Sequence, residues 1–185
     1  SEYAGHASVV FDAAHGLREA VAQVADFGHR RVAYLGADID RWTFRRRREA
    51  WREVMAEILP DAAVVEASAR LDLDAAAAAM RALLRDDIRP TALICADDLL
   101  AAGAFRAAAE EGVSIGDELS VVGFGGTIVG EALWPRLSGI VASGARLGAA
   151  AVALHLDGDP GHPARTVLDV ELVIRDSLGP VPAAA

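Results

Sequence analysis

The chain has no lysine, one cysteine and few aromatic residues. All 18 basic residues are arginines, which excludes Schiff-base chemistry and a phosphate-loop lysine. Cys95 has no partner for an internal disulfide, and its place in the apolar run "TALICA" predicts a buried residue in a reducing compartment. No apolar run approaches the roughly 20 residues that span a membrane, and no secretory signal is visible. These absences predict a cytoplasmic protein.

What is present is an acidic, apolar chain of 185 residues, 53% of them hydrophobic. That length allows one domain with a sizeable core, or one domain plus part of another. The 27 acidic and 18 basic residues give a net charge of −9, which argues against a nucleic-acid-binding surface on this chain.

Apolar runs alternate with helical patterns along the chain. The predicted strands are 6–11, 30–36, 62–67, 90–96, 118–125 and 165–177, the last as an edge strand or a hairpin pair. The predicted helices are 12–28, 43–59, 73–86, 97–112 and 145–156. Asp12 is expected to cap the first helix. The alternation predicts an α/β fold, a parallel sheet flanked by helices in three layers.

The stretch "SVVGFGGT", residues 120–127, predicts a buried strand that ends in a turn without functional side chains before Thr127. Ligands are expected at the carboxyl ends of strands in such sheets. A dinucleotide fingerprint fails because Ile128 stands where its third glycine is needed, and a P-loop fails because Glu131 and Ala132 replace its Lys-Ser/Thr pair. The turn is therefore not expected to bind a nucleotide.

Two charged clusters are candidate site elements. The arginines of "RRRREAWR", residues 45–52, point to all sides of a helix, so a solvated face is the default. The alternative is that one of them turns into a cleft and holds a polar ligand. Asp97 and Asp98 follow a strand, where one could cap the next helix and the other could accept from a ligand hydroxyl.

Catalytic signals are lacking. The five histidines have no metal-ligand spacing, no Cys/His cluster occurs, and neither Ser138 nor Ser143 lies in a nucleophile elbow. The sequence therefore predicts a protein that is not an enzyme and that uses no metal and no cofactor.

Several segments together resemble the lactose-repressor/galactose-repressor family of bacterial transcription regulators. They occur in the family's order and spacing: "LREAVAQVADFGHRRVAYLGA", "RRREAWREVM", "RPTALICADDLLAAGAFRAAAEEGVSIGDELSVVGFGGT", "LWPRLSGI" and "VELVIRDS". The resemblance implies a periplasmic-binding-protein-like fold of two α/β lobes with a small-molecule effector in the cleft. It also implies a dimer whose N-terminal helix-turn-helix binds operator DNA.

The resemblance also implies how the chain is divided. Residues 1–12 correspond to a remnant of the N-terminal lobe, followed by the C-terminal lobe (13–139), a crossover segment and helix (140–163), a returning strand (164–177) and a loose tail (178–185). A helix-turn-helix is not expected in this chain, so operator DNA would be contacted only by a part outside it.

Two glycines mark a departure from the family. The turn after the "SVVGF" strand usually carries two aspartates, the first accepting from effector hydroxyls, and Gly125 and Gly126 stand there. Asp97 replaces a usual asparagine. The swap implies that the effector is not a standard neutral sugar, being bulkier or more anionic, or that binding has been lost. Restoring both aspartates is expected to strengthen sugar binding.

Other positions keep or vary the family pattern. Arg47, four residues before Trp51, matches the arginine that grips the effector, although Ala50 replaces a usual glycine. Leu71 stands where an aromatic residue commonly lines the cleft. Trp134, in the "LWPRLSGI" segment, completes the predicted effector contacts.

The resemblance favours the effector-binding and dimerisation domain of a transcription regulator, with an atypical site for a sugar or sugar-like ligand, anionic ligands included. A stand-alone small-molecule-binding or interaction module is the alternative, and an enzyme is disfavoured. A homodimer is expected, with the apolar helices 74–84 and 99–109 as candidate contact faces.

Overall fold

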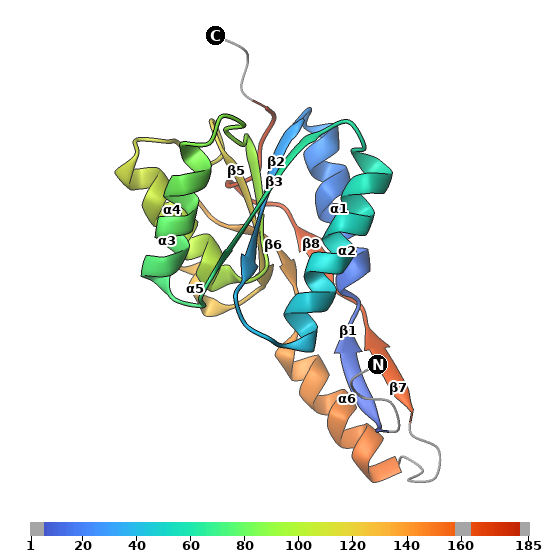
Figure 1. Cartoon of the computed structure of the whole chain (residues 1–185). Helices are drawn as coiled ribbons and strands as arrows, with labels where there is room; N and C mark the ends of the chain where they lie inside the picture. The colour runs from blue at the N-terminus through green and yellow to red at the C-terminus, as the bar shows by residue number, and fades with distance from the viewer. Residues whose placement is uncertain (1–5, 158–163, 182–185) are drawn as a thin grey trace.

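A computed structural model describes residues 6–157 and 164–181. Within these ranges, strands and helices alternate along most of the chain, as predicted (Figure 1). In chain order they are β1 (Ser8–Phe11), α1 (Ala13–Asp26), β2 (Arg31–Ala37), α2 (Trp42–Ile58), β3 (Ala63–Ala69), α3 (Leu73–Leu84), β4 (Ala92–Cys95), α4 (Asp98–Glu110), β5 (Ser120–Gly125), α5 (Ile128–Glu131), β6 (Ser138–Val141), α6 (Gly144–Asp157), β7 (Arg165–Leu168) and β8 (Glu171–Val173).

The main sheet has six strands in the order β3-β2-β4-β5-β6-β8. All of its pairs are parallel except the antiparallel pair of β6 with the edge strand β8. Every residue of β4 is buried, as expected for a parallel strand covered on both faces. Burial raises the pKa of the Cys95 thiol at the end of β4, so this cysteine is a protonated core residue, as its apolar run predicts.

Helices cover both faces of this sheet and give the predicted three layers. Figure 1 shows α1 and α2 on one face and α3, α4 and the short α5 on the other. Aspartates start three of these helices by accepting from a backbone N–H: Asp12 for α1, as predicted, Asp72 for α3 and Asp97 for α4.

The apolar faces of α3 and α4 pack against each other and the sheet. A methyl group added at Gly103 would lie only 2.3 Å from Cβ of Ala76, so the two helices are in close contact. Three ion pairs join their outer sides: Arg81–Glu110, Arg85–Glu111 and Arg106–Asp74. The apolar residues expected to form dimer contacts are therefore largely occupied inside this subunit.

A second, smaller unit extends from the main body. Strands β1 and β7 pair in parallel and form a sheet of their own, and α6 contacts both (Figure 1). We call β1, β7 and α6 the arm. Its helix has a large exposed apolar surface, where Val152 is 59% and Leu156 is 74% accessible.

The C-terminal part departs from the predicted divisions in three places. Strand β6 spans the predicted boundary between the C-terminal lobe and the crossover segment, so that boundary, between 139 and 140, falls within a strand. The expected returning strand, 164–177, divides between two sheets as β7 and β8. Residues 178–181 are packed instead of loose: Leu178 is 5% exposed, and the Val181 N–H donates to the Phe27 carbonyl. Residues 182–185 of the expected tail lie outside the described residues.

Helix α2 is held by a buried aromatic pair. Trp51 stacks on Tyr34 of β2, with ring centroids 4.8 Å apart and planes 22° from parallel. Both side chains are almost completely buried. The contact fixes α2 on the sheet, and thereby fixes Arg47, one turn before Trp51 on the same helix.

Candidate ligand-binding site

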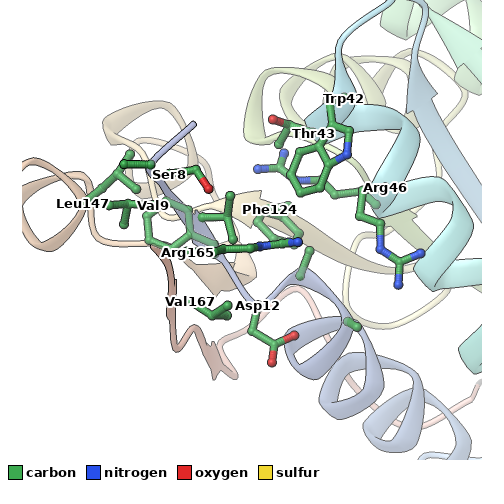
Figure 2. Close-up of a pocket in the computed structure, with 16 residues that line it drawn as sticks. Ser8, Val9, Asp12, Trp42, Thr43, Arg46, Phe124, Leu147, Arg165 and Val167 are labelled. Atoms are coloured by element: carbon green, nitrogen blue, oxygen red, sulfur yellow. The ribbon is translucent and has the colours of Figure 1, made fainter. Parts of the chain in front are cut away.

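A cavity of about 640 Å³ lies between the arm and the carboxyl edge of the main sheet. Strands β1 and β7, together with Leu147 of α6, form one wall, while the first turn of α2 and Phe124 of β5 form the other (Figure 2). Its volume suits a small molecule. Its place agrees with the rule that ligands of open α/β sheets bind beyond the carboxyl ends of the strands.

Arg47 is the buried member of the arginine cluster and lines this cavity. Its Nη1 donates to the Ala96 carbonyl at 2.6 Å, and its guanidinium lies 3.7 Å from the centroid of the Phe124 ring. Burial lowers the pKa of Arg47 from its ordinary value, and the nearby carboxylate of Asp97 opposes this effect. The group remains a cation, and its buried Nε has no hydrogen-bond partner within the described part of the chain.

Two aromatic rings and two further arginines, Arg46 and Arg165, complete the two walls. Phe124 is 1% exposed and presents its ring beneath Arg47. Trp42, the first residue of α2, lies with its ring centroid 5.6 Å from the guanidinium of Arg165 on β7. Figure 2 shows Arg165 reaching from the β7 side toward the α2 side, where Trp42 and Arg46 lie. The site thus combines flat apolar surfaces with cationic groups.

The two aspartates after β4 are both occupied within the protein. Asp97 accepts from the Leu99 N–H at 2.9 Å and caps α4. Asp98, 1% exposed, accepts from the backbone N–H of Thr127 at 2.7 Å and from its hydroxyl at 2.9 Å. One aspartate is thus a helix cap, as predicted, while the other holds the turn after β5. Neither residue lines the cavity.

The backbone of the double-glycine turn favours glycine. Gly125 has φ +140° and Gly126 has φ +67°, both in the region that L-residues rarely adopt. A Cβ at Gly125 would lie 3.3 Å from Oδ2 of Asp98, and one at Gly126 would lie 2.8 Å from Cγ1 of Val141. Aspartates at these positions would strain the backbone, and the first would face the Asp98 carboxylate. This geometry argues against the expectation that restoring them strengthens sugar binding.

Of the five predicted effector contacts, Arg47 alone belongs to the residues that line this cavity. Leu71 packs partly buried against the hydrophobic core, and Trp134 is 82% exposed in the segment between α5 and β6. Gly125, at the end of β5, and Asp97, at the start of α4, are not among the lining residues.

Sequence reasoning missed Phe124, Trp42 and Arg165. Phe124 lies in "SVVGFGGT", which the sequence predicts to lack functional side chains before Thr127, yet its ring lies against Arg47 in the cavity wall. Trp42 stands directly after a polar loop, where a large aromatic residue is a recognisable signal. Arg165 carries no local signal, since only the pairing of β7 with β1 places it beside α2.

Other kinds of site find no support in the described residues. Within 6–157 and 164–181, no group of three or more His, Cys, Asp or Glu side chains is arranged to hold a metal ion. Across the same ranges, no helix combines the length and apolar character needed to cross a bilayer.

Comparison with known proteins gives a consistent result. The model of the periplasmic binding protein-like domain family matches residues 21–178. The ribose operon repressor of Haemophilus influenzae is 28% identical over 165 residues, which are 86% of this chain and 49% of the repressor. The chain thus spans about half the length of the curated relatives it matches.

Solved structures agree with the sequence relatives. A dimeric Lac repressor with an 11-residue C-terminal deletion superposes with a TM-score of 0.87 at 26% identity, over 95% of this chain and 65% of that one. A LacI-family regulator from Arthrobacter sp. FB24, solved in complex with lactose, gives a TM-score of 0.82 at 29% identity, over 92% of this chain and 66% of that one.

The fold and the cavity define a ligand-binding α/β domain of the periplasmic-binding-protein type. The chain belongs to the periplasmic binding protein-like domain family, and within it to the effector-binding domains of LacI/GalR transcription regulators. The resemblance inferred from the sequence segments is thereby confirmed.

Proposed function

We propose that the cavity between the arm and the main sheet is the effector site of a transcription regulator. The observation that carries the proposal is the buried Arg47, a cation aimed at a cavity of about 640 Å³ with an aromatic floor. Its guanidinium has more N–H donors than the single bond from Nη1 to the Ala96 carbonyl uses, so a ligand with acceptor oxygens suits the cavity beside it.

The two walls of the cavity suggest how binding acts on the rest of the regulator. One wall belongs to the arm and the other to the main α/β unit, so a ligand that touches both favours one relative position of the two. A ligand shifts such an equilibrium by its difference in affinity for the two positions. The same mechanism couples effector and operator binding if the parent protein also carries a DNA-binding segment.

The site is atypical for its family because its acceptor groups are few. Asp12 is the one carboxylate among the residues that line the cavity, and one of its oxygens already caps α1 through the His15 N–H. The Asp98 carboxylate is held by Thr127 beneath the glycine turn. An effector with several hydroxyl donors would thus meet few partners here, which favours a ligand rich in acceptors.

The proposal extends to assembly and DNA. We expect this domain to form a homodimer, as the Lac repressor relative does. The net charge of −9 argues that operator contacts, if the regulator makes them, lie outside this domain. Sedimentation equilibrium of the 185-residue chain tests the first point, since a monomer at micromolar concentration would contradict it.

A thermal-shift screen tests the effector site. Sugars, sugar phosphates and nucleosides are added to the wild-type chain and to Arg47→Met, which keeps the apolar stem and removes the cation. A ligand that binds the folded state raises the melting temperature by mass action. We expect one ligand class to raise it in the wild type and to lose its effect in Arg47→Met.

Arg70→Met is the matched control, because Arg70 is exposed and lies outside the cavity lining. It should respond to ligand as the wild type does. An equal shift in the wild type and in Arg47→Met would place the ligand elsewhere and overturn the proposal. The absence of any shift across the panel would also count against it.

A further inference from the structure

The charges that line the cavity are mainly positive, in contrast to the acidic chain as a whole. The charged lining residues are three arginines and one aspartate: Arg46, Arg47, Arg165 and Asp12. With a net charge of −9 for the whole sequence, a random selection of charged groups would favour the opposite sign. The local excess of cations is therefore a property of the site.

The arginines differ in how far carboxylates already neutralise them. Arg46 lies 3.3 Å from Glu49 and 3.4 Å from Glu53, so its charge is largely balanced on the surface of α2. Within the described part of the chain, no carboxylate forms an ion pair with Arg47 or Arg165. Arg165 is placed over the Trp42 ring instead. Neither guanidinium group is therefore neutralised by a carboxylate ion pair, although Nη1 of Arg47 already donates to the Ala96 carbonyl.

These two groups come from opposite walls. Arg47 belongs to α2 on the main unit and Arg165 to β7 on the arm, and both line the same cavity. Figure 2 shows the Arg165 side chain extended across the cavity toward the α2 wall. An anion between them would contact both units and offset the repulsion of two like charges. Guanidinium groups bind carboxylate and phosphate oxygens in a planar, paired geometry.

We propose that the effector of this domain is anionic: a sugar-like body that carries a phosphate or carboxylate group held between Arg165 and Arg47. The inference rests on the proposed effector site and names the ligand class of that site. The ring of Phe124 lies against Arg47 and the ring of Trp42 against Arg165, so each arginine is positioned by an aromatic residue, and the two arginines bind the charged group of the ligand. Arg165 thereby determines specificity for charge.

Isothermal titration calorimetry of the full 185-residue chain tests this inference. The probes are hexose and pentose phosphates, the matching sugar acids, their neutral parent sugars, and inorganic phosphate alone. We expect a phosphorylated or carboxylated sugar to bind at least about tenfold more tightly than its neutral parent, as charge-assisted hydrogen bonds require. The phosphate and carboxylate series distinguish the two sources of charge.

Arg165→Gln is the decisive variant because Arg165 lies on the exposed strand of the arm and not in the core. It should weaken binding of the charged sugar by at least about tenfold more than it weakens binding of the neutral parent. Arg70→Gln makes the same change of charge outside the cavity and should alter neither affinity. Circular dichroism of both variants checks that the fold is retained.

The outcomes separate this inference from the proposed function. If a neutral sugar binds as tightly as its charged derivatives, and Arg47→Met abolishes that binding, the effector site stands and the anionic class is wrong. If a charged sugar binds but Arg165→Gln leaves its affinity unchanged, the assigned contact is wrong. If no member of the panel binds, both the site and the ligand class are overturned.

Discussion

The glycine turn after β5 allows a quantitative test of whether its backbone and its packing require glycine. Gly126→Ala adds only a methyl group, at a residue with φ +67°. That methyl group would lie 2.8 Å from Cγ1 and 3.2 Å from Cα of Val141 on β6. Two separate effects therefore oppose it, the left-handed backbone and the contact with the neighbouring strand.

Each effect has a known scale. A left-handed backbone costs an L-residue about 1–2 kcal/mol, and crowding in a packed region adds about 1–3 kcal/mol. Gly126→Ala should then lower the free energy of unfolding by about 3 kcal/mol. For a domain of this size, that change lowers the melting temperature by about 6–12 °C.

Two other glycines serve as controls for the two effects. Gly112 has φ +68°, but a Cβ there would have no neighbour within 4 Å, so Gly112→Ala should show the backbone cost alone, about 1–2 kcal/mol. Gly148 lies within α6, also with open space around it, and Gly148→Ala should stabilise the protein by about 0.5–1 kcal/mol.

Urea unfolding of the three variants followed by circular dichroism gives the free energies directly. From the most to the least stable, the expected order is Gly148→Ala, wild type, Gly112→Ala and Gly126→Ala. If Gly126→Ala were no less stable than Gly112→Ala, the crowding by Val141 would be refuted. The left-handed backbone at φ +67° would then be the remaining structural reason for glycine at this position.

Two further predictions concern buried polar groups. His29 is buried, its Nε2 donates to the Gly179 carbonyl at 2.9 Å, and burial lowers its pKa below the ordinary 6.5. The fold favours the neutral imidazole, so the contribution of His29 to the free energy of unfolding is complete above about pH 6.5. It is lost as the pH falls, by at most about 1.4 kcal/mol per pH unit. Urea titrations between pH 8 and 5 should show this loss, and His29→Gln should make the stability less dependent on pH. Tyr34→Phe should leave the free energy of unfolding unchanged or raise it, because the buried Tyr34 hydroxyl has no hydrogen-bond partner in the described residues; a loss above about 1 kcal/mol in the same assay would reveal a missing partner.

Local sequence patterns were enough to predict most of the secondary structure. The apolar run 90–96 and the helix after it are recognisable because burial on both faces demands continuous hydrophobicity and because Asp97 is a strong N-cap. The short strand β6 escaped prediction because four residues between glycine, serine and proline signals carry too little periodicity. The C-terminal residues 178–181 escaped because their hydrogen bonds depend on distant partners, Phe27 and His29.

The sequence by itself determined the alternation of strands and helices, the acidic and lysine-free composition, and the family to which the domain belongs. Within the arginine cluster, the resemblance to the family pointed to Arg47, whereas the helical pattern alone left open which arginine, if any, turns into a cleft. The tertiary structure decided which residues share the cavity. Arg165 and Trp42 are far apart in the chain and meet only because β7 pairs with β1 beside the start of α2. Contacts of this kind depend on the whole fold, so no local pattern in the sequence records them.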